Sequence, residues 1–252
     1  MHQSLKQCLL APQTEGDKKM QSNAEFDRYA ETYNDLLRDP VRDRFVQTRE
    51  FYHRRKWGLI TDFLQRRNLA MDALQWLDVG CGKGELLNYG RPHFRRVVGC
   101  DPSIEMARNT NGIEIHLQEK PGILPFPDAT FDFITAVCVF HHVQDVNRQP
   151  LCREIHRVLR SNGLFCMIEH NPFNPITQQI VSQCPVDVDA RLLTARLARS
   201  YAEATGLRHI ETQYFLYLPE RLYNRIGSLE TVFRSLPLGG QYAMMARKVT
   251  GE

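Results

Sequence analysis

The sequence predicts an α/β protein with a mostly parallel sheet and additional helices in its N-terminal part. Three observations support this fold class. From residue 74 onward, short runs rich in β-branched and aromatic residues alternate with helical stretches, which is typical of βαβ units. Residues 24–64 instead carry apolar side chains at helical spacing. A glycine-rich turn at residues 80–84 follows the first β-rich run, at the position where open α/β sheets bind ligands.

The N-terminal part of the chain is predicted to be helical. Residues 1–22 are polar and lack periodicity, which indicates a mobile tail. Apolar residues at helical spacing then predict one helix over residues 24–37 and a longer one over residues 41–64. We therefore expect residues 23–70 to form a helical cap or lid, and residues 71–252 to form the main domain.

The main domain is predicted to contain seven strands separated by helices. Short apolar runs bounded by turn residues are typical of strands that are covered on both faces. The expected strands are residues 74–79, 96–100, 113–117, 131–139, 164–169, 209–218 and 242–248, and the expected helices are residues 103–109, 150–159 and 194–205 and one helix within 219–236.

Composition and charge exclude several classes of protein. A hydrophobic content of 42% with 24% charged residues is typical of a globular chain and not of a disordered one. The 32 basic residues against 29 acidic ones leave a net charge of +3, too even a balance for the basic face that binds nucleic acid. No run approaches the roughly 20 apolar residues of a membrane span, and the N-terminus has no signal-peptide core. We therefore expect a cytoplasmic protein with no nucleic-acid or membrane partner.

The cysteines do not form a recognisable framework. Seven of them are spread along the chain, and no Cys-x-x-Cys pair occurs. This spacing predicts neither a set of disulfides nor a zinc site. Several cysteines lie inside apolar runs, where a thiol behaves as a small core residue. We expect no metal.

The glycine-rich turn indicates a nucleoside ligand. The first β-rich run continues as Val79-Gly80-Cys81-Gly82-Lys83-Gly84-Glu85, a strand that ends in a tight turn and opens a helix. A dinucleotide fingerprint would require glycine at position 85, and the Glu85 carboxylate would repel a pyrophosphate, which disfavours a dehydrogenase of the nicotinamide type. No Gly-Lys-Ser/Thr follows the turn, so a phosphate loop is excluded as well. The expected ligand carries a nucleoside but no phosphate.

An acidic residue ends the second predicted strand. Asp101 lies about 20 residues beyond the glycine turn, where a carboxylate can accept hydrogen bonds from two ribose hydroxyls. The alternative is an N-cap for the following helix, a role that Ser103 can fill instead.

Taken in order, these motifs resemble those of the class I S-adenosylmethionine-dependent methyltransferases, in particular the small-molecule branch related to the quinone-biosynthesis methylases. The resemblance covers about residues 74–168 and rests on LDVGCGKGELL, VVGCDPSIEMA, LPFPDATFDFITAVCVFHHV and LCREIHRVLRSNGLFCMI. It implies a Rossmann-like three-layer sandwich, with a mostly parallel seven-strand sheet whose last strand is antiparallel. It also implies S-adenosylmethionine as the cosubstrate and S-adenosylhomocysteine as the product.

The resemblance also implies a set of cofactor-binding residues. The glycine turn lies under the methionine part of the cofactor, Asp78 helps to hold its ammonium, and Asp101 binds the ribose. At the position where the family commonly has an acid for the adenine amino group, this chain has Lys120, and Glu119 is the nearest acid. The implied residues are Asp78, Gly80, Cys81, Gly82, Gly84, Asp101, Pro102, Ser103, Met106, Glu119 and Cys138.

Three residues are candidates for catalysis. His141 and His142 end the fourth predicted strand, and imidazole is well suited to accept a proton near neutral pH. Glu169 ends the fifth strand on the same side of the sheet, over the expected position of a methyl acceptor, and His170 and Asn171 follow it. The alternatives are structural hydrogen bonds for the histidines and a turn for residues 169–171, because Asn-Pro dipeptides follow.

The second predicted helix carries a basic run made of Arg49, Arg54, Arg55 and Lys56. Such charges are either the solvated face of an amphipathic helix or a grip for an anionic substrate.

The predicted function is methyl transfer from S-adenosylmethionine to oxygen or nitrogen of a small metabolite. The sulfonium is already an activated donor, so the protein chiefly has to align a nucleophile and exclude water. The alternatives are methylation of carbon on a quinone-like ring, and a cofactor-binding regulator without catalytic activity.

Overall fold

The fold is a seven-stranded sheet between two layers of helices. The computed structural model describes residues 32–37, 40–46, 48–107 and 112–249. The strand order is β3-β2-β1-β4-β5-β7-β6, and β7 runs antiparallel to both of its neighbours. The strands are β1 (Gln75–Val79), β2 (Arg96–Asp101), β3 (Glu114–Leu117), β4 (Phe131–Val137), β5 (Leu159–His170), β6 (Leu207–Phe215) and β7 (Gln241–Lys248). This arrangement confirms the predicted fold class, including the antiparallel last strand.

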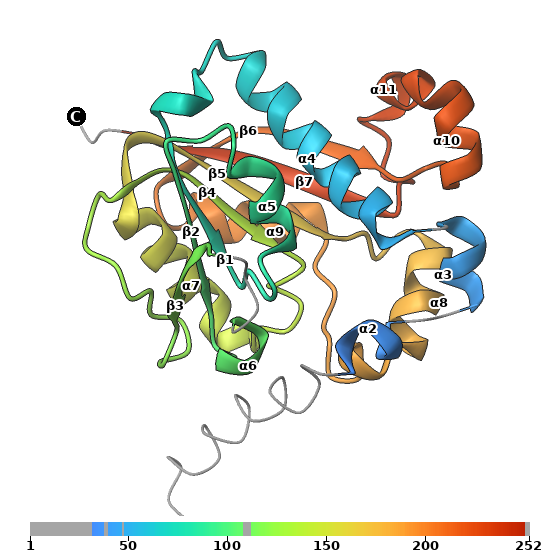
Figure 1. The fold of residues 1–252 in the computed structure, drawn as a ribbon, viewed down its shortest axis with the longest axis horizontal. Helices are drawn as coiled ribbons and strands as arrows, with labels where there is room; N and C mark the ends of the chain where they lie inside the picture. The colour runs from blue at the N-terminus through green and yellow to red at the C-terminus, as the bar shows by residue number, and fades with distance from the viewer. Residues whose placement is uncertain (1–31, 38–39, 47, 108–111, 250–252) are drawn as a thin grey trace, which may run out of the picture.

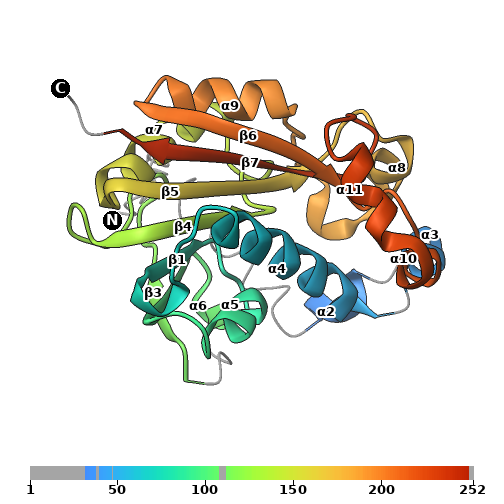
Figure 2. The ribbon, with the colours of Figure 1, turned by 90° about the horizontal axis from the view of Figure 1, so that it is seen from above.

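Helices cover both faces of the sheet (Figures 1 and 2). On one face lie α7 and α9, and on the other lie α4 and α5, as the two apolar clusters below show. The helices are α2 (Tyr33–Leu36), α3 (Pro40–Phe45), α4 (Arg49–Gln65), α5 (Glu85–Gly90), α6 (Ile104–Ala107), α7 (Asp145–Val158), α8 (Pro175–Gln183), α9 (Ala195–Glu203), α10 (Glu220–Ile226) and α11 (Glu230–Phe233).

Each central strand is buried along most of its length because it is covered on both faces. In β1, every residue from Trp76 to Val79 is buried, and β5 and β7 each contain a run of at least six buried residues. Such continuous apolar strands are expected in a sheet between two helical layers. The predicted strands therefore match the observed ones to within a few residues, apart from β5, which begins at Leu159 instead of residue 164.

Two apolar clusters form the core, one on each face of the sheet. The first joins α7 and α9 to the sheet through residues such as Ile155 and Ala198. The second joins α4 and α5 to the opposite face and includes Phe63 of α4 and Leu87 of α5. In α4, Ile60, Phe63 and Leu64 are fully buried. This helix is therefore part of the core, although it lies within the segment that was expected to form a cap or lid.

The predicted N-terminal lid is only partly described. The tail at residues 1–22 and most of the helix expected over residues 24–37 lie outside the described residues, which begin in this region with Thr32. Within the described part, Leu37, Arg42 and Phe45 line the cavity discussed below. The boundary between lid and main domain at residue 70 therefore stays a prediction, although α4 itself belongs to the core.

The two Asn-Pro dipeptides have different structures. Glu169 and His170 belong to β5, and a turn over Pro172 and Phe173 follows Asn171, whereas Asn174-Pro175 begins α8. The Asn174 side chain accepts a hydrogen bond from the Thr177 amide at 2.9 Å, and Pro175 occupies the first helical position, where its missing N–H leaves no unpaired donor. An Asn-Pro dipeptide thus follows the end of β5 at residues 171–172, and a second one, at residues 174–175, provides the N-cap and the first residue of α8.

Among the described helices, none combines the length and apolar character needed to cross a membrane.

Candidate active site

A cavity of about 890 Å³ lies at the carboxyl ends of the parallel strands. Its lining comes from the glycine turn after β1, the end of β2, the turn after β4, the end of β5 and the N-terminal helices. Because β7 is antiparallel, it begins at the same edge, and its register places Gln241 opposite His170 of β5. From β1 the chain first adds β2 and β3 on one side of the sheet and then β4 and β5 on the other. Open α/β sheets bind their ligands at this switch point, beside the carboxyl end of the first strand.

The glycine turn brings bare backbone to the cavity. Gly80, Gly82 and Gly84 all have positive φ, between 51° and 69°, a conformation that favours glycine. A Cβ added at Gly80 would lie 2.5 Å from a methyl of Val139, so the turn packs closely against the end of β4. A Cβ added at Gly82 would meet nothing closer than the Met106 methyl at 3.6 Å. The space beside Gly82 is thus kept open, as the methionine part of the expected cofactor requires.

Asp101 ends β2 and fixes the turn. One carboxylate oxygen accepts the Gly82 amide at 2.8 Å and the other accepts the Ser103 amide at 2.8 Å. Ser103, and not Asp101, makes the N-cap hydrogen bond of the following helix, because its hydroxyl accepts the Met106 amide. The Asp101 carboxylate lines the cavity, and its binding of the ribose stays a prediction. Each carboxylate oxygen retains acceptor capacity, because an ionised carboxyl has about four lone-pair sites. Ribose hydroxyls remain suitable partners.

The region expected to hold adenine differs from the sequence-based assignment. Pro102 and Met106 line the cavity, whereas Ser103 is fully buried and receives the Met106 amide at 3.2 Å. Glu119 is exposed, and its neighbour Gln118 is buried and lines the cavity. The side chain at position 118 is therefore the better-placed polar group, and its amide can both donate to and accept from a base edge.

Asp78 is a buried carboxyl at the floor of the cavity. The indole N–H of Trp76 donates to the Thr135 hydroxyl at 2.8 Å, and that hydroxyl donates to Asp78 at 2.5 Å. Burial raises the pKa of Asp78 to about 7, although the Thr135 hydrogen bond and the nearby Lys56 charge act in the opposite direction. A cationic ligand group at this place would favour the ionised form.

This shift predicts a pH-dependent affinity. Below a pKa of about 7 Asp78 is mostly protonated, and a cofactor ammonium pairs with the ionised form, so binding must release a proton there. Affinity for S-adenosylhomocysteine is expected to rise from about pH 5.5 and to level off above pH 7. Calorimetry in two buffers of different ionisation enthalpy measures the proton release. Asp78→Asn should abolish it, and His53→Asn, which removes another ionisable side chain of the cavity, should not.

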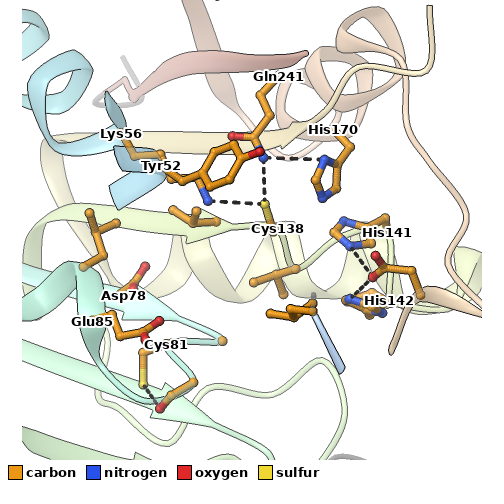
Figure 3. A pocket seen from close by; sticks show the side chains of 18 of the residues that line it. Tyr52, Lys56, Asp78, Cys81, Glu85, Cys138, His141, His142, His170 and Gln241 are labelled. Carbon is orange, nitrogen blue, oxygen red and sulfur yellow. Dashed lines mark hydrogen bonds and ion pairs between the residues drawn. The ribbon is translucent and has the colours of Figure 1, made fainter. Parts of the chain in front are cut away.

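Lys56 reaches the cavity from α4. It is only 8% exposed, and its ammonium donates to the Cys138 thiol at 3.6 Å (Figure 3). The Gln241 side-chain amide lies 3.4 Å from the same sulfur and 3.5 Å from Nδ1 of His170. Cys138 itself has a φ of 58°, which turns the chain sharply at the end of β4. A buried ammonium beside this thiol is suited to a carboxylate of the cofactor or the acceptor.

The other basic residues of α4 have structural partners. Arg54 forms an ion pair with Glu220, and Arg55 pairs with Glu230 and stacks over the Tyr223 ring. These contacts tie α4 to the C-terminal helices α10 and α11. Of the predicted basic run, Lys56 thus reaches the cavity, while Arg54 and Arg55 do not line it; the side chain of Arg49 lies outside the described part.

The candidate catalytic residues form one hydrogen-bonded group. Glu169 is fully buried, and one of its oxygens accepts the amides of Val139 and Phe140 at 2.9 and 2.7 Å. Its other oxygen lies 2.5 Å from Nδ1 of His141. Across the ring, His141 Nε2 lies 3.7 Å from an oxygen of Asp187, and His142 Nε2 lies 3.3 Å from the same oxygen.

The charges of this group are set by burial and by its two carboxylates. Burial alone would disfavour a charged His141, but Glu169 and Asp187 outweigh it and raise the pKa of His141 to about 10. Burial and the His141 charge lower the pKa of His142 to about 4 and that of His170 to about 3. Near neutral pH His142 is therefore a neutral imidazole that lines the cavity beside the Asp187 carboxylate.

The predicted site residues divide into two groups. Those in contact with the cavity are Asp78, Gly80, Cys81, Gly82, Asp101, Pro102, Met106, Cys138, His141 and His142, while Gly84, Ser103, Glu119 and Glu169 do not line it. The contacts of Glu169 identify it as a positioning residue for the turn after β4; a role in the chemical step stays a prediction. Cavity residues that sequence analysis did not single out include Tyr52, Gln118, Asp187 and Gln241.

Comparisons with known proteins agree with this geometry. Residues 77–167 match the family described as "Methyltransferase domain". This segment holds the glycine turn, Asp101 and the turn after β4, and it ends just before Glu169. The match identifies the segment as a methyltransferase domain of the class I type, for which the cosubstrate is S-adenosylmethionine.

Individual relatives cover the same part of the chain. An uncharacterized methyltransferase of Bacillus subtilis, YcgJ, is 32% identical over 115 residues, which is 42% of this chain and 45% of that protein. An uncharacterized methyltransferase of Schizosaccharomyces pombe is 30% identical over 131 residues, 49% of this chain and 50% of that protein. The chain thus spans about half the length of these relatives.

A solved structure extends the likeness to nearly the whole fold. The protein from Thermotoga maritima described as a possible histamine N-methyltransferase superposes with a TM-score of 0.63 at 16% identity, covering 88% of this chain and 98% of that one. At this identity, the likeness shows that the fold is shared.

Proposed function

We propose that this chain, which carries a class I S-adenosylmethionine-dependent methyltransferase domain, transfers a methyl group to oxygen or nitrogen of a small-molecule acceptor. One observation carries the proposal: the segment that matches the methyltransferase family, residues 77–167, supplies much of the lining of the cavity at the strand ends. The cavity volume of about 890 Å³ lies within the range of roughly 300–1,000 Å³ found for small-molecule sites.

The residues of the cavity fit the cosubstrate that the family implies. Gly82 leaves the backbone bare, Asp101 presents a carboxylate, and Asp78 and Lys56 offer opposite charges for an amino-acid moiety. S-adenosylmethionine supplies an activated methyl group when bound. The remaining tasks belong to this chain: to orient an acceptor, to exclude water and to accept the acceptor's proton.

The polar lining favours a heteroatom acceptor over a quinone-like ring. On the side of Cys138 away from the glycine turn, the cavity presents His141, His142 and His170, with Asp187 between the first two (Figure 3). An apolar ring would shield these polar groups from water without offering them a hydrogen bond, which is unfavourable. A hydroxyl or amine can hydrogen-bond to His142 and give up its proton there as the methyl group arrives.

The first test is cofactor binding. S-adenosylhomocysteine should bind the full chain, and Asp101→Ala should weaken binding by at least about 1.5 kcal/mol, the size of a hydrogen bond to a charged group. Because Asp101 also accepts the Gly82 and Ser103 amides, the loss includes a less ordered turn. Calorimetry measures the affinity, and Asp128→Ala, which changes an exposed acid far from the cavity, is the control. Unchanged affinity in Asp101→Ala would contradict the assignment.

The second test is turnover. The chain is incubated with S-adenosylmethionine and a panel of amines, alcohols, phenols and quinols, and formation of S-adenosylhomocysteine is followed. Product with an amine or hydroxyl acceptor supports the proposal, product with carbon acceptors alone would replace it by carbon methylation, and cofactor binding without any turnover would favour a regulator.

A further inference from the structure

Two histidines and an aspartate converge on one point of the cavity wall. Figure 3 shows His141 and His142 on the far side of Cys138 from Cys81. The candidate ligand atoms of His141, His142 and Asp187 all lie within 4.8 Å of one another. The two histidine Nε2 atoms lie 3.7 and 3.3 Å from the same Asp187 oxygen. We call these three residues the His–Asp cluster.

These separations suit a common metal ligand sphere. With metal–ligand distances of about 2.0–2.2 Å, two ligand atoms in a tetrahedral site lie roughly 3.3 Å apart. The His142–Asp187 distance already has this value, and the His141–Asp187 distance exceeds it by a few tenths of an ångström. The two histidine ligand atoms lie within 4.8 Å of each other, so the imidazoles would move together by up to about 1.5 Å to complete such a sphere.

The surrounding structure orients the first of these ligands. Glu169, which is fully buried, accepts a hydrogen bond from Nδ1 of His141. Nδ1 therefore keeps its proton, and Nε2 faces the Asp187 oxygen at 3.7 Å. Because the two carboxylates keep His141 protonated near neutral pH, a metal ion would bind Nε2 by displacing its proton. A carboxylate that holds the outer nitrogen of a histidine is the usual support of a metal-binding imidazole.

The charge and type of the groups favour a divalent cation. Once a metal ion has displaced the Nε2 proton of His141, both imidazoles are neutral, and Glu169 and Asp187 bring two negative charges to a place that is almost fully shielded from water. Two imidazoles and one carboxylate are a ligand set that zinc and similar transition metals prefer over magnesium or calcium.

We propose that His141, His142 and Asp187 bind one divalent transition-metal ion of the zinc type, with a coordination position open to the cavity. The ligands are contributed by the turn after β4 and by the segment that follows α8, and all three line the cavity. With the ion bound, His142 would be a ligand and would no longer be the proton acceptor. An acceptor hydroxyl or amine at the open position would be polarised by the ion and would release its proton to solvent more readily, before the methyl transfer. That role rests on the proposed function, whereas the binding of the metal does not.

Zinc binding by the full chain, measured without cofactor, tests the proposal. Calorimetric titration with zinc chloride should give one ion per chain. Asp187→Asn and His142→Asn are each expected to weaken binding by at least about tenfold. His116→Asn is the matched control, because His116 also lies 2.8 Å from a carboxylate, that of Glu114, but in an exposed pair on β3. Its affinity should equal that of the unmodified chain.

X-ray absorption of the bound zinc identifies the ligand atoms. The proposal requires nitrogen and oxygen only, whereas a sulfur ligand would assign the ion to one of the free cysteines. The proposal is overturned by sulfur ligation, by the absence of one-to-one binding, or by unaltered affinity in both cluster variants. Circular dichroism verifies that each variant is folded. Zinc binding in a chain that fails to bind S-adenosylhomocysteine would refute the proposed function but not the metal site.

Discussion

Replacing Gly82 with valine is expected to lower the affinity for S-adenosylhomocysteine by up to about 100-fold, because overpacking a close contact typically costs ~1–3 kcal/mol and the cofactor cannot move away from the turn. The glycine has a φ of 51°, and an added Cβ would point into the cavity with only the Met106 methyl nearby, at 3.6 Å. The side chain therefore clashes with little of the protein and occupies space that the ligand needs. Calorimetry measures the loss.

The backbone strain of this substitution has a matched control. A non-glycine residue at positive φ costs about 1–2 kcal/mol, and Gly112 has a comparable φ of 77° on a loop beside the Arg91 guanidinium, with no atom nearer than 3.8 Å to an added Cβ. Gly112→Val should thus lose similar stability but bind S-adenosylhomocysteine normally. Normal binding by Gly82→Val would place the cofactor elsewhere, and equal loss in both variants would show that strain, and not occupied space, is responsible.

The part of the site that is local in sequence could be predicted. Gly80, Gly82 and Asp101 lie directly after two apolar strands, and parallel neighbours end at the same edge of a sheet. The β1–β2 register therefore brings the turn and the carboxylate together without any further information. The strands themselves were predictable for the same reason, since their burial on both faces leaves continuous apolar runs.

The part contributed by distant segments could not be predicted. Gln241 begins a strand that meets β5 antiparallel, and Asp187 follows α8, a helix that the sequence analysis did not predict. Neither residue belongs to a motif, and their places in the cavity follow from packing alone. Gln118 had a weaker signal, because it directly precedes the expected acid Glu119. In the structure Gln118 is buried and Glu119 is exposed, so Gln118 is the one that lines the cavity. A single sequence predicts such a difference poorly, because the ends of a short strand such as β3 are the least certain part of a prediction.

Lys56 shows how tertiary packing changes the meaning of a charge pattern. In sequence, it is the last member of a basic run that is typical of a solvated helix face. In the fold, α4 lies against the sheet, so its basic residues are directed to different surroundings: Arg54 and Arg55 to acidic residues of the C-terminal helices, and Lys56 to the cavity. Helix α4 thereby serves both the core and the site.

Replacing Glu169 with alanine is expected to lower the free energy of unfolding by about 3–5 kcal/mol, a large share of the roughly 5–15 kcal/mol that stabilises a typical domain. The substitution leaves the amides of Val139 and Phe140 without their acceptor and removes the partner of His141. Each buried donor left unpaired costs about 1–3 kcal/mol. The turn after β4, which carries Cys138 and both candidate histidines, should become disordered, so binding of S-adenosylhomocysteine should weaken as well.

Two further variants separate this explanation from a general effect of removing an acid. Glu169→Gln keeps one oxygen that can accept both amides, and it should recover most of the stability once His141 changes tautomer. Glu154→Ala is the control, because Glu154 also accepts a backbone amide, that of Leu124 at 2.9 Å, and pairs with Arg157 at a more exposed place; its loss should stay near 1 kcal/mol. Urea unfolding measures all three. If Glu169→Ala lowers the free energy of unfolding by no more than Glu154→Ala does, Glu169 does not hold the turn. Its buried carboxylate must then be retained for the chemistry of the cavity.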